Sequence, residues 1–256
     1  MHKKEDYIAV FDSGVGGISV LKELLSCMPK ENYLYFGDSA NAPYGSKTTA
    51  QVRDLTVAAA QMLVSRGIKA LVVACNTATA AAINDLRDLF PDLIVIGIEP
   101  ALKVAADRFP GGKIGVMATP VTLREEKFAQ QVERFPGVDV QTIGVPALAE
   151  LIEAGHINDA TVEELLRPAL TPYAGKLDAV VLGCTHYPFA AKTIRKLLGD
   201  NTAILDGGAG TACQTRRRLE AAGLLSDGPG SLQVENSTGE PRLLQLSMTL
   251  LESSDL

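Results

Sequence analysis

The fold is decided by an eight-residue stretch that occurs twice in the chain. It reads ALVVACNT at residues 70–77 and AVVLGCTH at residues 179–186. In each copy an apolar run is followed by a cysteine and then by polar residues. Short, continuous apolar runs of this kind are typical of strands that are buried on both faces, as in parallel sheets. The two copies therefore predict two similar units, each with a cysteine at the carboxyl end of a strand.

Other short apolar runs alternate with helical patterns along the chain. Strands are expected at residues 7–11, 33–36, 70–74, 93–98, 113–118, 138–142, 179–182 and 203–205. Helices are expected at residues 47–66, 122–134, 188–198 and 209–222, and in a run that Asn158 caps at its N-terminus. Gly67 is placed to end the first of these helices. The alternation favours an α/β fold with mainly parallel sheets.

A second, weaker repeat supports a chain of two lobes. Residues 8–13 (IAVFDS) resemble residues 114–119 (IGVMAT), again as an apolar strand that ends in polar residues. Open α/β sheets bind ligands at the carboxyl ends of their strands, so the active site is expected in the cleft between the lobes. The expected lobes comprise residues 1–98 with 207–256, on the Cys75 side, and residues 99–206, on the Cys184 side.

The composition excludes several classes of protein. Of the 256 residues, 46% are hydrophobic and 21% are charged, which is enough apolar material for a folded core. The net charge of −6 argues against a nucleic-acid or anionic-membrane partner, since both require a basic face. No apolar run is long enough to cross a membrane or to form the core of an export signal, which predicts a cytoplasmic protein.

Two of the four cysteines are candidates for chemistry. The cysteines are too few for a disulfide framework, and their spacing suggests no metal site. Cys27 and Cys213 lie within helical patterns and are expected to be structural. Cys75 and Cys184 each lie between a strand and a segment that can begin a helix, where the helix dipole stabilises a thiolate. A thiolate on one side of a carbon atom and a thiol on the other can invert a stereocentre by proton transfer, without a cofactor.

Polar side chains near the other strand ends complete the candidate site. His186 can stabilise a nearby thiolate or transfer protons. The turn DSGVGG at residues 12–17 lacks the third glycine of the dinucleotide fingerprint. We interpret it as a cradle of backbone amides for a small carboxylate, with Asp12 as a proton-handling group. The polar loop at residues 37–45 is expected near the same site. Glu153, taken alone, resembles a solvated charge on a helix.

Five motifs, in this order along nearly the whole chain, resemble those of the glutamate racemases. They are DSGVGG at 12–17, GDSANAPYG at 37–45, ACNTA at 74–78, EP at 99–100 and LGCTHYP at 182–188. This family consists of cofactor-independent isomerases that interconvert L- and D-glutamate and supply D-glutamate for bacterial peptidoglycan. The resemblance implies two flavodoxin-like lobes, glutamate as the small-molecule substrate, no cofactor and a homodimer.

The resemblance also implies a role for each site residue. Cys75 would be the base for D-glutamate, with Asp12 assisting. Cys184 would be the base for L-glutamate, with His186 and Glu153 assisting. Besides Asp12 and His186, the implied substrate contacts are Ser13, Pro43, Tyr44, Gly45, Asn76, Thr77, Thr119 and Thr185. None of the motifs contains an arginine, so the substrate carboxylates would be bound by neutral donors.

Three alternative functions stay open on the sequence alone. The first is another member of the same superfamily, an aspartate racemase or a maleate-isomerase-like enzyme. The second is a protein that binds an acidic amino acid without turnover. The third is a thiol hydrolase that uses Cys184 and His186, with Cys75 in a structural role. The chain departs from the family pattern at Gly207 and at Glu125, where serines are common, but neither departure touches the two cysteines.

Overall fold

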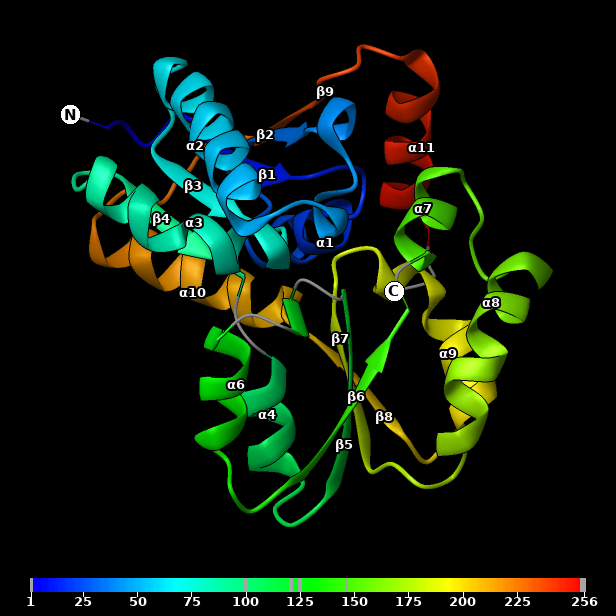
Figure 1. Cartoon of the computed structure of the whole chain (residues 1–256). Helices are drawn as coiled ribbons and strands as arrows, with labels where there is room; N and C mark the ends of the chain where they lie inside the picture. Colours follow the sequence, from blue (N-terminus) through cyan, green and yellow to red (C-terminus); the bar gives the residue numbers. More distant parts are fainter. Residues whose placement is uncertain (1, 99–100, 120–121, 124–125, 146, 254–256) are drawn as a thin grey trace.

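Two parallel sheets form the framework of the molecule (Figure 1). The computed structural model describes residues 2–98, 101–119, 122–123, 126–145 and 147–253. The first sheet has the strand order β4-β3-β1-β2-β9, the second has the order β6-β5-β7-β8, and all neighbouring strands are parallel. The prediction of an α/β fold built on two parallel sheets is confirmed. The motif at residues 99–100 and the departure at Glu125 lie outside the described residues.

Every expected strand is present, and its limits differ from the prediction by at most two residues. The strands of the first sheet are β1 (Ile8–Asp12), β2 (Asn32–Gly37), β3 (Ala70–Val73), β4 (Ile94–Gly97) and β9 (Ser231–Asn236). Those of the second are β5 (Lys113–Ala118), β6 (Asp139–Gly144), β7 (Ala179–Gly183) and β8 (Ala203–Asp206). The described α-helices are α1 (Ile18–Cys27), α2 (Thr49–Ser65), α3 (Asn76–Leu89), α4 (Ala101–Arg108), α6 (Glu126–Glu133), α7 (Leu148–Glu153), α8 (Ala160–Leu170), α9 (Ala191–Leu198), α10 (Gly208–Ala221) and α11 (Pro241–Glu252).

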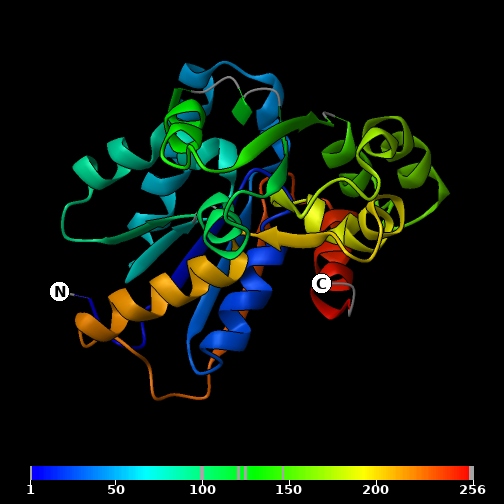
Figure 2. The ribbon, with the colours of Figure 1, turned by 90° about the horizontal axis from the view of Figure 1, so that it is seen from below.

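Strand β1 shows why the apolar runs are continuous. Ala9 and Phe11 pack in a cluster with α2 and α3, whereas Ile8 and Val10 pack in another cluster with α1 and α10. Figure 2 shows α10 (orange) beside α1 (blue), and the two helices are in contact. Because successive side chains of a strand point to opposite faces, a strand covered on both faces needs apolar residues at every position. Burial on both faces therefore explains the pattern from which the strands were predicted.

A continuous apolar core joins the two sheets. The cluster that lies under α1 and α10 continues into the second sheet at Met117 and Leu182, and into helices α7, α8 and α9. A hydrogen bond also crosses the junction, because the Ser19 hydroxyl of α1 donates to the Thr185 carbonyl at 2.9 Å. The shared core and this hydrogen bond thus join the two sheets at the point where their polar strand ends meet.

The structure corrects one predicted helix cap and confirms another helix end. Gly67 follows the end of α2 with φ +77°, a conformation that glycine adopts without strain, as predicted. Asn158 does not cap α8. Its side chain bonds to the Phe189 carbonyl and to Thr193, and the carboxylate of the next residue, Asp159, caps α8 by accepting from the Val162 N–H at 3.0 Å. Asn and Asp are both good N-cap residues, and the prediction placed the cap one residue too early in the chain.

The C-terminal segment contains two elements that the sequence analysis missed. Strand β9 pairs with β2 along its whole length, and α11 then packs against α1. The chain therefore returns to the first sheet after β8. The lobe limits proposed from the sequence, at residues 98/99 and 206/207, stay a prediction.

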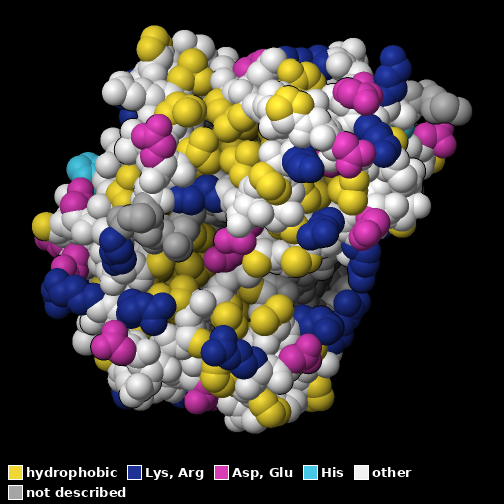
Figure 3. All heavy atoms as spheres, turned by 180° about the vertical axis from the view of Figure 1, so that it is seen from behind, with side chains coloured by type: hydrophobic (Ala, Val, Ile, Leu, Met, Phe, Trp, Pro, Cys, Tyr) yellow, Lys and Arg dark blue, Asp and Glu magenta, His cyan; other side chains and the backbone are white. Residues whose placement is uncertain are grey.

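The surface carries charges of both signs. On the face shown in Figure 3, Lys and Arg side chains are interspersed with Asp and Glu. This mixture differs from the continuous basic face that nucleic-acid binding requires, and the expected lack of a nucleic-acid partner stays a prediction. None of the helices in the described part of the chain combines the length and apolarity needed to cross a bilayer.

Candidate active site

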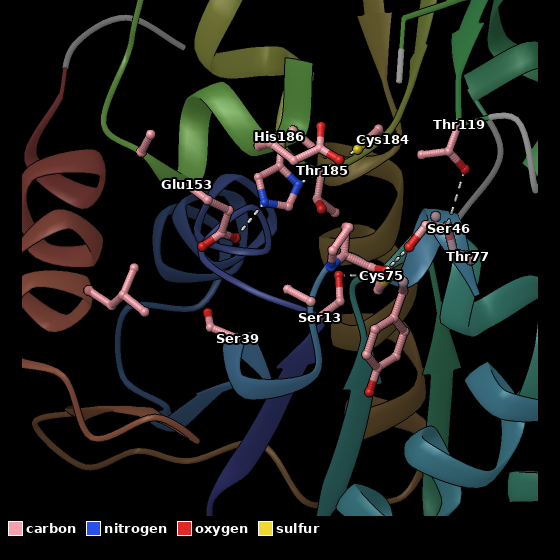
Figure 4. A pocket seen from close by; sticks show the side chains of 18 of the residues that line it. Ser13, Ser39, Ser46, Cys75, Thr77, Thr119, Glu153, Cys184, Thr185 and His186 are labelled. Atoms are coloured by element: carbon pink, nitrogen blue, oxygen red, sulfur yellow. Dashed lines mark hydrogen bonds and ion pairs between the residues drawn. The ribbon is translucent and has the colours of Figure 1, made fainter. Parts of the chain in front are cut away.

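A cavity of about 450 Å³ opens where the carboxyl ends of the two sheets meet. Its wall contains residues that lie within two positions of the ends of β1, β3, β5 and β7. The structure brings together all but one of the predicted site residues in this wall: Ser13, Pro43, Tyr44, Gly45, Cys75, Asn76, Thr77, Thr119, Glu153, Cys184, Thr185 and His186. The exception is Asp12, which is fully buried directly behind the wall. Figure 4 shows Cys75 and Cys184 on opposite sides of the cavity.

Cys75 occupies the N-cap position of α3. Its Sγ accepts from the Ala78 N–H at 3.4 Å and lies 3.5 Å from the Ser13 hydroxyl. The sequence predicted that the helix terminus would favour the thiolate, but the structure shows the opposite balance. Burial, reinforced by the nearby charge of Asp12, outweighs these two contacts and raises the pKa of Cys75 to about 12. At neutral pH the Cys75 group is therefore a protonated thiol.

Asp12 links the two sides of the site. One carboxylate oxygen accepts from the Gly14 N–H at 3.0 Å, and the other accepts from the Thr185 hydroxyl, also at 3.0 Å. Burial raises the pKa of Asp12 to about 6, although the charge of His186 and these two hydrogen bonds oppose the shift. Asp12 therefore changes its charge within a pH range in which many enzymes work.

A buried chain of polar groups leads to Cys184. Its Sγ lies 3.6 Å from His186 Nδ1, and His186 Nε2 lies 2.7 Å from Glu153 Oε1 (Figure 4). Burial disfavours a charged imidazole, but Cys184 and Glu153 outweigh it and raise the pKa of His186 well above its usual range. Burial would raise the pKa of Glu153, but His186 and the Val15 N–H lower it below its ordinary value. The resulting imidazolium–carboxylate pair places a positive charge beside the Cys184 sulfur.

The glycine-rich turn binds a carboxylate, but the carboxylate belongs to the chain itself. The Val15 N–H donates to Glu153 Oε1 at 2.7 Å, and the Gly14 N–H is used by Asp12. A Cβ atom at Gly14 would lie 1.8 Å from Glu153 Oε1, and one at Gly16 would lie 2.4 Å from His186 Nδ1. The glycines therefore make room for the side chains of Glu153 and His186. The interpretation of the turn as a cradle for a ligand carboxylate is wrong in this respect, because its amides bind the chain's own carboxylates.

Neutral polar groups also line the wall. The hydroxyls of Thr77 and Thr119 lie 3.5 Å apart. The Oδ1 atom of Asn76 is buried and has no hydrogen-bond partner among the described residues. A buried acceptor of this kind is costly unless a donor meets it.

Two groups of site residues were missed by the sequence analysis. Asp38 accepts from the Tyr44 hydroxyl at 2.8 Å, and the Tyr35 hydroxyl donates to the Gly14 carbonyl at 2.5 Å, so both hold parts of the wall in place. Asp38 lies inside a recognised motif, which could have identified it. The second group comes from the C-terminal segment and consists of Thr238, Glu240, Arg242 and Leu243. No motif marks these residues.

Comparisons with known proteins agree with this site. The family model for Asp/Glu/Hydantoin racemases matches residues 16–214. A glutamate racemase of Clostridium botulinum (strain Alaska E43 / Type E3) is 46% identical over 258 residues, which cover 99% of this chain and 100% of that protein. The crystal structure of the Francisella tularensis glutamate racemase in complex with D-glutamate is similar with a TM-score of 0.87, at 28% identity, over 98% of this chain and 95% of that one. The Escherichia coli glutamate racemase, in complex with L-glutamate and the activator UDP-MurNAc-ala, is similar with a TM-score of 0.85, at 30% identity, over 97% and 94% of the two chains. The chain belongs to the Asp/Glu/Hydantoin racemase family.

Proposed function

We propose that the protein is a glutamate racemase that interconverts L- and D-glutamate with two cysteines and no cofactor. The observation that carries the proposal is the placement of Cys75 and Cys184, which follow equivalent strands of the two sheets and face one cavity. The names of the relatives, and the glutamate bound in two of the similar structures, support glutamate as the substrate. In the cell, the reaction would supply D-glutamate for bacterial peptidoglycan.

The two sides of the cavity are suited to opposite halves of the reaction. The Cys184 thiolate, stabilised by the His186–Glu153 pair, takes the α-proton from L-glutamate. The protonated thiol of Cys75 then delivers its proton to the opposite face of the carbanion, which gives D-glutamate. The reverse reaction starts with the Cys75 thiolate and ends with proton delivery by Cys184. The number of protons is conserved, because one thiol gains the proton that the other loses.

Neutral groups are positioned to bind the zwitterionic substrate. Asn76 lines the cavity, and its amide is available to the substrate ammonium group. The hydroxyls of Ser13, Thr77, Thr119 and Thr185 are available to the carboxylates, and Pro43, Tyr44 and Gly45 supply the facing wall. Hydroxyls and amides bind carboxylates well when water is excluded.

The direct test is to incubate the purified protein with L-glutamate in heavy water, without pyridoxal phosphate. We expect the optical rotation to disappear while deuterium enters the α-position. A signal with aspartate in place of glutamate would establish the aspartate racemase alternative, and isomerisation of maleate would establish the maleate-isomerase alternative. Binding of glutamate without α-exchange would support the binding protein. Hydrolysis of a thioester or amide without α-exchange would support the hydrolase.

Asp12→Asn is expected to slow racemisation and to change how stability depends on pH. Burial raises the pKa of Asp12 from 3.8 to about 6, so the folded protein binds more protons than the unfolded chain between these pH values. In wild type, this residue alone therefore lowers the free energy of unfolding by about 2 kcal/mol as the pH rises from 4 to 6, out of about 3 kcal/mol over its whole titration. The variant should lack this slope, and its kcat should fall about 10- to 100-fold. Urea unfolding at a series of pH values and steady-state kinetics test the two parts.

If the free energy of unfolding depends on pH in the variant as it does in wild type, Asp12 has the same pKa in the folded and unfolded states. An unchanged kcat across the pH range would remove Asp12 from the proton-handling role.

The homodimer, the cytoplasmic location and the lobe limits stay predictions. Light scattering after size-exclusion chromatography tests the first of them.

A further inference from the structure

Arg242 reaches from the C-terminal helix to the end of helix α7. Its Nη1 donates to the carbonyl oxygen of Glu153 at 3.0 Å. Arg242 lies in the first turn of α11, which follows β9 of the first sheet, whereas Glu153 is the last residue of α7, which follows β6 of the second sheet. Figure 1 shows α11 (red) beside α7 (green). The hydrogen bond therefore ties an element of one sheet to a functional residue carried by the other.

We propose that Arg242 is a positioning residue for the Cys184 side of the reaction. This inference rests on the proposed racemase function. Arg242 fixes the backbone of Glu153, so that the carboxylate of the same residue stays between the Val15 N–H and His186 Nε2. Through His186, the position of Glu153 controls how well the Cys184 thiolate is stabilised.

The local geometry explains why the backbone of Glu153 needs an external partner. Helix α7 has only six residues, and the last carbonyls of a helix have no amide partner within the helix. A cationic side chain at this end satisfies such a carbonyl and interacts favourably with the helix dipole. The Glu153 carboxylate is held by the β1–α1 turn, which also belongs to the first sheet. Glu153 is thus held at both its backbone and its carboxylate by elements of the other sheet.

A competing role for Arg242 is direct binding of a substrate carboxylate, because the residue also lines the cavity. The two roles differ in their kinetic effect. If Arg242 binds the substrate, its removal should weaken substrate binding and raise KM for both enantiomers. A positioning residue for Cys184 instead slows proton transfer on one face of the α-carbon.

The test compares Arg242→Ala, Arg242→Lys and the control Gln245→Ala, an exposed residue of the same helix. We expect kcat to fall about threefold to tenfold in Arg242→Ala, with partial recovery in Arg242→Lys, which keeps one donor. The primary deuterium isotope effect on kcat/KM should rise for α-deuterated L-glutamate, because the Cys184 step becomes more rate-limiting. It should fall for α-deuterated D-glutamate, whose labelled bond is broken by Cys75.

A second readout does not depend on turnover. The pKa of His186, followed by NMR of its ring protons, should be lower in Arg242→Ala than in wild type, because Glu153 is less well placed beside it. Unchanged isotope effects with a raised KM would assign Arg242 to substrate binding instead. Behaviour equal to that of Gln245→Ala in every measurement would leave Arg242 without a role. A failure of the proposed function itself would be visible in wild type, as a lack of α-exchange with glutamate.

Discussion

Replacing Cys75 or Cys184 by serine is expected to lower kcat for glutamate racemisation by about 10²- to 10⁴-fold. A serine hydroxyl has a much higher pKa than a thiol, so it neither removes the α-proton nor supports its return at neutral pH. Both cysteines are buried, and the change in side-chain volume is small. The folded structure should therefore persist, with a melting temperature within a few degrees of the wild-type value.

Hydrogen exchange separates the two cysteines from each other. With Cys184→Ser in heavy water, the remaining thiol faces only D-glutamate, so α-deuterium should enter D-glutamate and not L-glutamate. Cys75→Ser should show the reverse preference. Cys213→Ser, at an exposed cysteine of α10, is the matched control and should keep wild-type activity. A Cys75 or Cys184 variant that keeps more than a few per cent of the wild-type rate would remove that cysteine from the mechanism.

The sequence predicted the central strands of the fold but not its C-terminal edge. Central strands such as β1 are buried on both faces, and this leaves continuous apolar runs that can be recognised without further information. Strand β9 (SLQVEN) is an edge strand with one neighbour, and most of its residues are only partly buried. Its polar pattern therefore resembles a loop. Helix α11 did carry a signal, because Pro241 occupies its first position, where proline is favoured.

The site residues at strand ends could be predicted from the sequence. Those whose position depends on contacts between residues far apart in the chain could not. Cys75, Cys184 and Asp12 each follow or end an apolar run, so position along the chain identified them. Glu153 lies on a short helix with no distinguishing pattern, and only the family resemblance pointed to it. Its carboxylate bonds to Val15, 138 residues away in the chain, which no local pattern can reveal. The raised pKa of Cys75 was missed for a similar reason, because burial is a property of the packed structure.

Gly14→Ala should be nearly as damaging as loss of a cysteine, with kcat lowered about 10²- to 10³-fold although no reacting atom is changed. The added Cβ would lie 1.8 Å from Glu153 Oε1, and the Tyr35 hydroxyl holds the Gly14 carbonyl in place. The carboxylate must therefore leave its positions beside the Val15 N–H and His186. Gly14 does not have a positive φ, so the expected effect comes from this clash and not from backbone strain. The matched control is Gly137→Ala, where a Cβ meets nothing within 4 Å.

A double-mutant cycle shows whether the clash with Glu153 is the cause. Glu153→Asp shortens the side chain by one methylene group, which makes room for the new methyl group at position 14. We therefore expect Gly14→Ala combined with Glu153→Asp to be more active than Gly14→Ala alone, even though Glu153→Asp lowers kcat in the wild-type background. Steady-state kinetics of the four proteins measure the coupling, and distant, independent sites would give additive losses. Additive losses here would mean that the turn acts on the substrate directly. Positive coupling would mean that the turn is glycine-rich because it receives the chain's own carboxylate, and that this carboxylate, through His186, sets the reactivity of Cys184.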